Sequence, residues 1–253
     1  MPCIALLTDF GTRDPYLAVM KGVIVSRCSV PLFDLTHDIE PFDVFEAAWF
    51  LRTAVPWWPP GTIFVAVVDP GVGTERKLLA CERAGRLFLA PDNGLLTFVC
   101  GDSAQAVSVE NESLFLPDGS TTFHGRDRLA PVAAALANGV TLDQLGEPVR
   151  EIVRLDYAPP VYAPHVRGTI VSVDRFGNLI TDVEADRIGF DELLLMAKDV
   201  TIDRHFKNYA LGGSDPFLII GSTGCVEISV GGGSAADVLH LRRGDRVEIR
   251  RRS

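Results

Sequence analysis

Carboxylate and imidazole side chains stand at turn-like positions beside several apolar runs of this sequence. Asp9 and Asp69 each end an apolar run, Asp92 lies in a Pro-Asp-Asn-Gly turn, and His124 and Asp127 lie where a helical pattern begins. Such a set can transfer protons, orient a water molecule or hold the metal ion of a hydrolase. Each residue alone is unspecific, because an aspartate in a turn most often stabilises that turn.

Two further patterns argue against particular kinds of site. Gly71-Val72-Gly73 lacks both the lysine and threonine of a P-loop and the GxGxxG spacing, so we exclude a nucleoside triphosphate site. The five cysteines are an odd number, widely spaced and without a CxxC pair. We therefore expect neither a disulfide framework nor a zinc site.

The composition is that of a folded globular protein. Of the 253 residues, 47% are hydrophobic and 23% charged, and the net charge of -9 argues against a nucleic-acid partner. The first apolar stretch contains Asp9, unlike a signal peptide, and no apolar run reaches the roughly 18 residues of a membrane span. We expect a cytoplasmic protein without a membrane partner.

The N-terminal part alternates strand-like and helix-like segments, which predicts a Rossmann-like α/β domain with a mainly parallel sheet. Strands are expected at Cys3–Thr8, Pro31–Leu35, Ile63–Val68 and Arg86–Ala90. Helices are expected after an Asp14-Pro15 cap, after a capping box of Asp43 and Glu46, and over Asp127–Asn138 before Gly139. In such a sheet, ligands bind outside the carboxyl ends of the strands, where the titratable residues above would gather.

A change of pattern divides the chain. Residues 158–166 are rich in proline and lack periodicity, so we place a linker there, between domains of residues 1–157 and 167–253. Beyond it, short apolar runs alternate with glycine turns and predict a small antiparallel β-barrel domain. Its expected strands are Gly168–Val173, Leu179–Val183, Lys198–Ile202, Phe217–Ile220, Cys225–Val230 and Arg246–Arg250.

Six motifs, in order along nearly the whole chain, resemble those of the S-adenosyl-L-methionine (SAM) hydroxide adenosyltransferase family. They are Leu7-Thr8-Asp9-Phe10-Gly11, Asp34-Leu35-Thr36-His37, Val67-Val68-Asp69-Pro70-Gly71-Val72-Gly73, Pro91-Asp92-Asn93-Gly94, Thr122-Phe123-His124-Gly125-Arg126-Asp127 and Asp174-Arg175-Phe176-Gly177-Asn178-Leu179. These enzymes are relatives of the fluorinating and chlorinating enzymes. The resemblance implies cleavage of SAM at the C5′–sulfur bond by water or hydroxide, giving adenosine and methionine.

The same resemblance assigns catalytic residues. By motif, Asp69, Arg76 and His124 position and activate the attacking water. A sulfonium departs as a neutral thioether, so no general acid, metal or organic cofactor is required. Histidine near its ordinary pKa can accept a proton, whereas an aspartate paired with arginine stays ionised and is a poor base. We therefore expect His124 to be the base.

Binding residues follow from the resemblance too. Asp9 is expected to hold the ribose hydroxyls, Phe42 to lie against the sugar, Asp174 to bind the methionine ammonium, and Asn178 to recognise adenine. The remaining expected contacts are Phe176 as an apolar wall, Tyr209 or Phe206 stacked on the purine, and Ser222 with the Thr223 backbone at the methionine carboxylate. The family also implies a homotrimer with active sites at subunit interfaces.

Departures from the halogenases favour hydrolysis. Those enzymes have tyrosine and threonine where this chain has Asp69 and Val72, and an inserted loop that is missing here; Thr223 replaces one of their arginines. An ionised Asp69 would repel a halide. Three alternatives stay open: a halide-using SAM adenosyltransferase, a non-catalytic module that binds adenosine or SAM, and a metal-dependent hydrolase built on the acidic set above.

Overall fold

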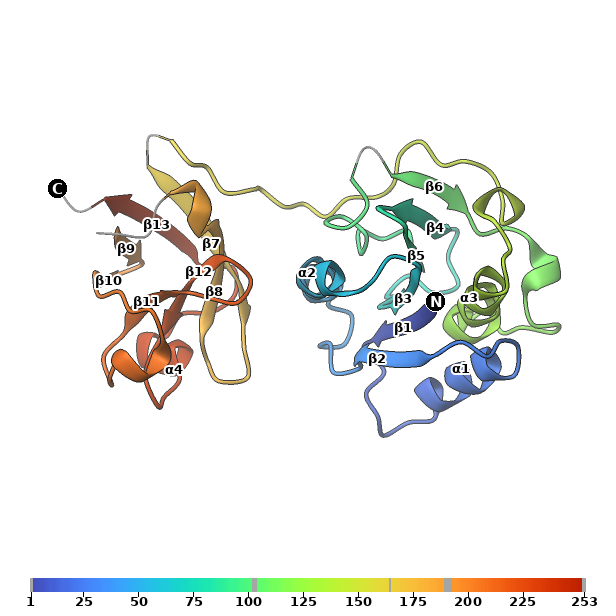
Figure 1. Cartoon of the computed structure of the whole chain (residues 1–253), viewed down its shortest axis with the longest axis horizontal. Helices are drawn as coiled ribbons and strands as arrows, with labels where there is room; N and C mark the ends of the chain where they lie inside the picture. The colour runs from blue at the N-terminus through green and yellow to red at the C-terminus, as the bar shows by residue number, and fades with distance from the viewer. Residues whose placement is uncertain (1, 102–103, 164, 189–192, 252–253) are drawn as a thin grey trace. The chain divides into compact units, whose positions relative to one another are not determined.

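A computed structural model of the chain describes residues 2–101, 104–163, 165–188 and 193–251. The chain forms two compact units, Met1–Asp156 and Tyr157–Ser253. The expected linker at 158–166 falls in the second unit by this division, and its residue 164 lies outside the described residues. Figure 1 labels the elements of both units.

The N-terminal unit contains a six-stranded sheet in the order β2-β1-β3-β5-β4-β6. Its strands are β1 (Cys3–Thr8), β2 (Leu32–Thr36), β3 (Thr62–Val67), β4 (Leu78–Arg83), β5 (Arg86–Pro91) and β6 (Gln105–Ser108). The first four strands of that order pair in parallel, and β4 pairs antiparallel with both β5 and β6. The predicted α/β fold is confirmed, although the sequence pattern did not predict β4 or β6.

Helices cover both faces of this sheet, as Figure 1 shows. Helices α1 (Tyr16–Val25) and α3 (Ala130–Ala137) pack on the face that carries Ile4 and Leu6 of β1. Helix α2 (Val44–Ala54) packs on the opposite face, with Ala5 and Leu7. Successive side chains of a strand point to opposite faces, so an unbroken apolar run such as β1 belongs between two helical layers.

The N-terminal ends of α1 and α2 differ from the sequence prediction. Pro15, not Asp14, is the residue before α1, and no side chain caps that helix. The box of Asp43 and Glu46 is half formed: Asp43 accepts a hydrogen bond from the Glu46 amide, while the Glu46 carboxylate accepts one from the amide of Glu40. Among the described residues, no helix has both the length and the apolar character needed to cross a bilayer.

The C-terminal unit is a barrel-like antiparallel sheet in the order β10-β9-β13-β7-β8-β12-β11. Its strands are β7 (Val166–Val173), β8 (Leu179–Glu184), β9 (Leu193–Ala197), β10 (Val200–Ile202), β11 (Phe217–Ile220), β12 (Cys225–Ser229) and β13 (Arg246–Arg251), with helix α4 (Ala235–Leu239). Strand β9 was not predicted, and the strand expected from Lys198 begins at Val200, because Lys198 has a φ of 49° in the turn.

Shorter helical segments complete the described chain. The 3₁₀ segments are Val55–Trp57, Glu112–Leu114, Leu142–Gln144, Ala185–Arg187 and Tyr209–Leu211, and residues Gly125–Leu129 form a π-helical turn.

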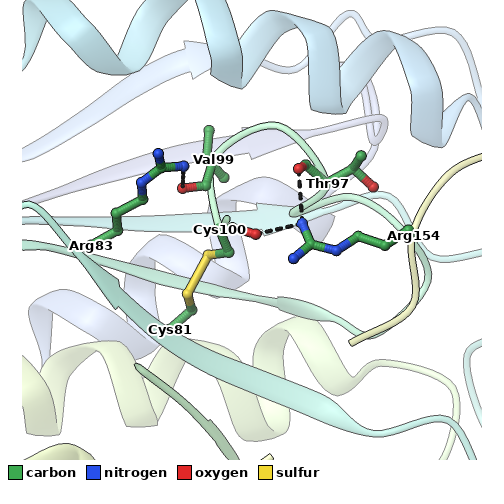
Figure 2. The surroundings of a disulfide bond; sticks show 6 residues. All are labelled: Cys81, Arg83, Thr97, Val99, Cys100 and Arg154. Carbon is green, nitrogen blue, oxygen red and sulfur yellow. Dashed lines mark hydrogen bonds between the residues drawn. A yellow bond between two sulfur atoms is a disulfide. The ribbon is translucent and has the colours of Figure 1, made fainter. Parts of the chain in front are cut away.

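Cys81 and Cys100 form a disulfide, contrary to the expectation from cysteine spacing. Figure 2 shows that two arginines also donate hydrogen bonds to the segment after β5. Arg83 donates to the Val99 carbonyl at 3.1 Å, and Arg154 donates to the carbonyls of Thr97, at 2.9 Å, and Cys100. The prediction was wrong because the partners meet only through β4, a strand that the sequence pattern did not reveal.

Removing this disulfide with the double substitution Cys81→Ala and Cys100→Ala should lower the free energy of unfolding by about 3 kcal/mol, because the bond closes a loop between residues 19 apart. Urea unfolding of the oxidised wild type and the double variant measures the difference. Cys28→Ser, at a half-buried free cysteine, is the control and should change the midpoint little. An unchanged midpoint in the double variant would contradict the prediction.

Candidate active site

The register of the parallel strands brings Asp9 and Asp69 to one edge of the N-terminal sheet. Thr8 of β1 lies opposite Val67 of β3, so the residues that follow each strand leave the sheet side by side. Burial raises the pKa of Asp9, and the nearby Asp69 charge adds to that shift. The gathering of these two carboxylates at the carboxyl ends of the strands is what the open-sheet rule predicts.

Asp69, Arg76 and His124 form one hydrogen-bonded cluster. Arg76 Nε donates to Asp69 Oδ1 at 2.6 Å, and Arg76 Nη2 donates to Asp69 Oδ2. The same Nη2 lies 3.1 Å from His124 Nδ1. The Asp69 and Arg76 side chains are only 7% and 9% exposed, so the pair is largely shielded from water. A two-pronged contact of this kind fixes the orientation of the guanidinium plane.

A tight succession of turns returns the chain from Asp69 to Arg76. The Val72 amide donates to the Asp69 carbonyl at 3.2 Å, and the Thr74 amide and hydroxyl both donate to the Gly71 carbonyl. Gly73 has a φ of 82°, and a Cβ there would lie 3.1 Å from the Thr121 carbonyl oxygen. Gly71 and Gly73 therefore allow a tight turn that brings the Arg76 side chain into contact with Asp69.

His124 immediately precedes the π-helical turn at Gly125–Leu129. The segment packs tightly: a Cβ on Gly125 would lie 3.2 Å from Met20 Sδ of α1 and 3.4 Å from Val67 Cγ1 of β3. His124 is 4% exposed. Burial lowers the pKa of His124, and the charges of Arg128 and Arg76 lower it further. The imidazole is therefore neutral at neutral pH.

The Arg76 contact also fixes which imidazole nitrogen carries the proton. A guanidinium only donates hydrogen bonds, so His124 Nδ1 must be the acceptor in the 3.1 Å contact. In the neutral ring the proton is then on Nε2, which is a donor. Arg76 Nη1 is a second donor: it is buried and has no hydrogen-bond partner among the described residues.

Asp9 and Phe42 lie together. The Phe42 amide donates to Asp9 Oδ2 at 2.9 Å, and Phe42 is a bulky residue in the left-handed region, with a φ of 70° and its side chain 68% exposed. Burial raises the pKa of Asp9, and hydrogen bonds from the Phe42 amide and from its own backbone partly oppose that shift. Backbone strain of this kind is concentrated at functional sites.

His37 braces the loop that carries Asp9. Its Nδ1 lies 2.9 Å from the Thr8 hydroxyl, which in turn accepts a hydrogen bond from the Phe10 amide. The His37 carbonyl accepts from the Gly11 amide at 2.8 Å. Thr8, Phe10 and Gly11 flank Asp9 on both sides, so this network sets the direction of its carboxylate.

In the C-terminal unit, Asp174 organises a tight turn after β7. Its Oδ1 accepts from the amides of Phe176 and Asn178, both at 2.9 Å, and its Oδ2 accepts from Asn178 Nδ2 at 2.8 Å. Phe176 is left 77% exposed at the tip of the turn. The structure therefore brings these three predicted residues together around one carboxylate.

Three further predicted residues lie in two other segments of this unit. Ser222 and Thr223 are exposed in the turn between β11 and β12. Tyr209 begins a 3₁₀ segment, is 47% exposed, and donates its hydroxyl to Glu227 Oε1 at 2.8 Å. Phe206, the alternative to Tyr209, packs edge-on against the fully buried Phe217. Glu227 was missed by sequence reasoning because the local pattern does not show that it is buried.

The remaining acidic residues of the possible metal set are engaged elsewhere. Asp92 accepts a hydrogen bond from the Val153 amide at 2.8 Å, and Asp127 accepts from Arg126 and from the Ser120 amide. Within the described ranges, no three histidine, cysteine, aspartate or glutamate side chains gather as a metal site. Asp92 and Asp127 therefore stabilise the loops that surround the cluster.

Comparison with known proteins adds the family. A family model described as the SAM hydroxide adenosyltransferase N-terminal domain matches residues 4–146, and the corresponding C-terminal domain matches residues 168–248. An (R)-S-adenosyl-L-methionine hydrolase of Thermus thermophilus is 38% identical over 260 residues, which cover 97% of this chain and 98% of that protein. A fluorinase of an Actinoplanes species is 29% identical over 289 residues, covering 98% of this chain and 97% of that protein.

A solved structure extends the comparison to the fold. The crystal structure of an uncharacterized conserved protein from Thermotoga maritima superposes with a TM-score of 0.91 at 36% identity. The match covers 98% of this chain and 100% of that one. The chain belongs to the SAM hydroxide adenosyltransferase family.

Proposed function

We propose that the protein hydrolyses SAM to adenosine and L-methionine by attack of hydroxide on C5′. The observation that carries the proposal is the buried cluster of Asp69, Arg76 and His124 in a chain whose relatives at 32–38% identity are named SAM hydrolases. A module that only binds adenosine or SAM has no need of such a cluster. The reaction forms a C5′–oxygen bond, and the electron pair of the broken C5′–sulfur bond stays on the thioether.

The cluster offers two hydrogen-bond donors to an attacking oxygen, and Arg76 offsets the charge of Asp69. Both Asp69 oxygens and His124 Nδ1 already accept hydrogen bonds from Arg76, while Arg76 Nη1 and His124 Nε2 are donors. Two donors in a shielded site stabilise a negatively charged oxygen at the position from which it attacks. This arrangement favours His124 as a donor that holds hydroxide, rather than as the base that was expected from its ordinary pKa.

Neither a metal nor an organic cofactor enters this proposal, because the sulfonium is already activated for displacement. The expected substrate contacts are those assigned by the resemblance, with Asp9 holding the ribose diol. Asp9 suits that role because a carboxylate can accept hydrogen bonds from both hydroxyls of a diol.

Incubation of the protein with SAM in oxygen-18 water, with chloride present, tests the reaction. We expect adenosine with one labelled oxygen at C5′, together with methionine. Unlabelled adenosine would refute attack on C5′ by solvent oxygen, and 5′-chloro-5′-deoxyadenosine would establish the halide-using alternative. Activity lost on treatment with a chelator and restored by a divalent metal would favour the metal-dependent alternative, and no turnover would favour the binding module.

We also propose an oligomeric state and a cellular location, neither of which follows from the geometry of the site. A homotrimer with active sites at subunit interfaces rests on the family resemblance, and sedimentation velocity tests it through the mass of the particle in solution. A cytoplasmic location is likewise a proposal, and cell fractionation tests it.

A further inference from the structure

Glu227 is a buried carboxylate that the proposed chemistry does not use. It lies in β12 with 4% of its surface exposed, and its Oε1 accepts hydrogen bonds from the Tyr209 hydroxyl at 2.8 Å and from Ser229 Oγ at 2.9 Å. No basic side chain pairs with it in the described part of the chain. Buried glutamates are rare unless they are paired, so the burial of Glu227 indicates that it has a specific function.

The position of Glu227 connects it to two loops. Through Oε1 it holds Tyr209, which begins the exposed 3₁₀ segment. Its Oε2 lies where a Cβ on Gly221 would approach to 2.5 Å, so a side chain at the start of the turn that carries Ser222 and Thr223 would have to displace the carboxylate. The carboxylate therefore lies beneath two loops that carry expected substrate contacts.

Glu227 and Tyr209 influence each other's pKa. Burial raises the pKa of Tyr209 to about 12, and the hydrogen bond to Glu227 and the Glu227 charge add to the shift. Burial also raises the pKa of Glu227; the hydrogen bonds from Tyr209 and Ser229 oppose that shift, and the Asp174 charge adds to it. Asp174 acts on both groups, so the three segments that carry these residues share one electrostatic environment.

We propose that Glu227 is a positioning residue for the substrate: by accepting the hydrogen bond of Tyr209 it fixes the exposed aromatic ring in the orientation in which it packs against the adenosyl group. The inference rests on the proposed function. Holding an exposed side chain in place before binding reduces the entropy lost when the ligand arrives. Tyrosine suits the task because one end of the ring is apolar and the other can be anchored.

Steady-state kinetics with SAM separate this role from a purely structural one. Tyr209→Phe keeps the ring but removes the anchor, and should raise KM about fivefold with kcat nearly unchanged. Glu227→Gln should raise KM less, because the amide oxygen still accepts the hydroxyl. Ser229→Ala is the matched control, since it removes the other hydrogen bond of Glu227 and leaves Tyr209 anchored. Equal KM values in Tyr209→Phe and the wild type, or an equal rise in Ser229→Ala, would overturn the proposal.

A second measurement does not depend on turnover. With tyrosine labelled at Cζ by carbon-13, the resonance absent from Tyr209→Phe is that of Tyr209, one of the 4 tyrosines. We expect it to remain un-ionised at about pH 11 in the wild type and to ionise closer to pH 10 in Glu227→Gln, where the repelling charge is gone. An unchanged midpoint would overturn the link between the residues. If SAM is not hydrolysed, the proposed function fails while this titration still tests the contact.

Discussion

Replacing Arg76 by lysine should lower kcat for SAM hydrolysis by about 10³-fold and leave KM for SAM almost unchanged. The guanidinium contacts both Asp69 oxygens and His124 Nδ1 while keeping Nη1 unpartnered among the described residues. A lysine ammonium is a point charge without this planar set of donors, so it cannot make all of these contacts at once. Because the cluster is proposed to act on the nucleophile, substrate binding should be little affected.

The lysine variant is informative because it keeps the positive charge beside the shielded Asp69. It should therefore fold, which circular dichroism and the thermal midpoint verify, whereas an alanine variant would leave Asp69 unpaired and destabilise the fold. Arg128→Lys is the matched control: Arg128 also raises the local positive potential at His124, but its guanidinium packs over the Phe115 ring. A kcat for Arg76→Lys within tenfold of the wild type would refute the role of the guanidinium.

The second large effect concerns His124. His124→Ala should lower kcat by about 10²- to 10³-fold, whereas His124→Asn should retain roughly a tenth of the activity. Asparagine offers an oxygen in the place of Nδ1 that accepts from Arg76, and an amide that keeps a donor close to the position of Nε2. It cannot take up a proton. If His124 is instead the base, the asparagine and alanine variants should be equally impaired.

The pH dependence of kcat gives a second test of whether His124 acts as a hydrogen-bond donor or as the base. Burial holds the pKa of His124 below its ordinary value of 6.5, so the neutral ring persists into mildly acidic solution. Protonation of Nδ1 removes the acceptor for Arg76, and kcat of the wild type should fall at pH values below that lowered pKa. His124→Asn should lack this acidic limb. An acidic limb that persists in His124→Asn would assign the titration to another group.

Stability should follow the same titration with a defined sign. Between the lowered pKa of His124 and 6.5, the unfolded chain binds a proton that the native chain does not. The contribution of His124 to the free energy of unfolding therefore rises with pH across this window and is lost as the pH falls. Urea unfolding of the wild type and His124→Asn across this range measures the difference.

The placement of Asp9 and Asp69 at one edge of the sheet was predictable because it follows from strand order. The runs that became β1 and β3 are continuous and apolar, which is characteristic of strands buried on both faces, and β1 begins and ends as predicted. Once the two strands are parallel neighbours, Asp9 and Asp69 must emerge at the same edge. Local pattern and topology agree here, so little tertiary information is required.

The π-helical turn after His124, in contrast, could not be predicted from the sequence pattern. The sequence pattern predicts one helix from Asp127 to Asn138, but α3 begins at Ala130 and the preceding turn is wider. A single wide turn is too short to alter the apolar periodicity from which helices are predicted. The orientation of His124 toward Arg76 therefore could not be obtained from the sequence.

Glu227 escaped prediction for another reason. In a strand, Cys225, Glu227 and Ser229 share one face, and a face of small and polar side chains usually lies toward water. Here all five residues of β12 are buried. The Tyr209 hydroxyl reaches Glu227 from the 3₁₀ segment. Burial that comes from a contact distant in the sequence leaves no trace in the local pattern.

The short turn from Asp69 to Arg76 has a consequence for how this fold can acquire new chemistry. It carries Asp69 and Arg76, two of the three residues proposed to position the nucleophile, and hydrogen bonds within the turn join Val72 to Asp69, Thr74 to Gly71 and Arg76 to Asp69. Exchange of this turn would alter the nucleophile while the layers that bury the sheet stay intact. Hydrolases and fluorinases both align with nearly the full length of this chain. A change between water and halide as the reactant is thus compatible with one fold, because the residues concerned lie in a turn outside the layers of the sheet.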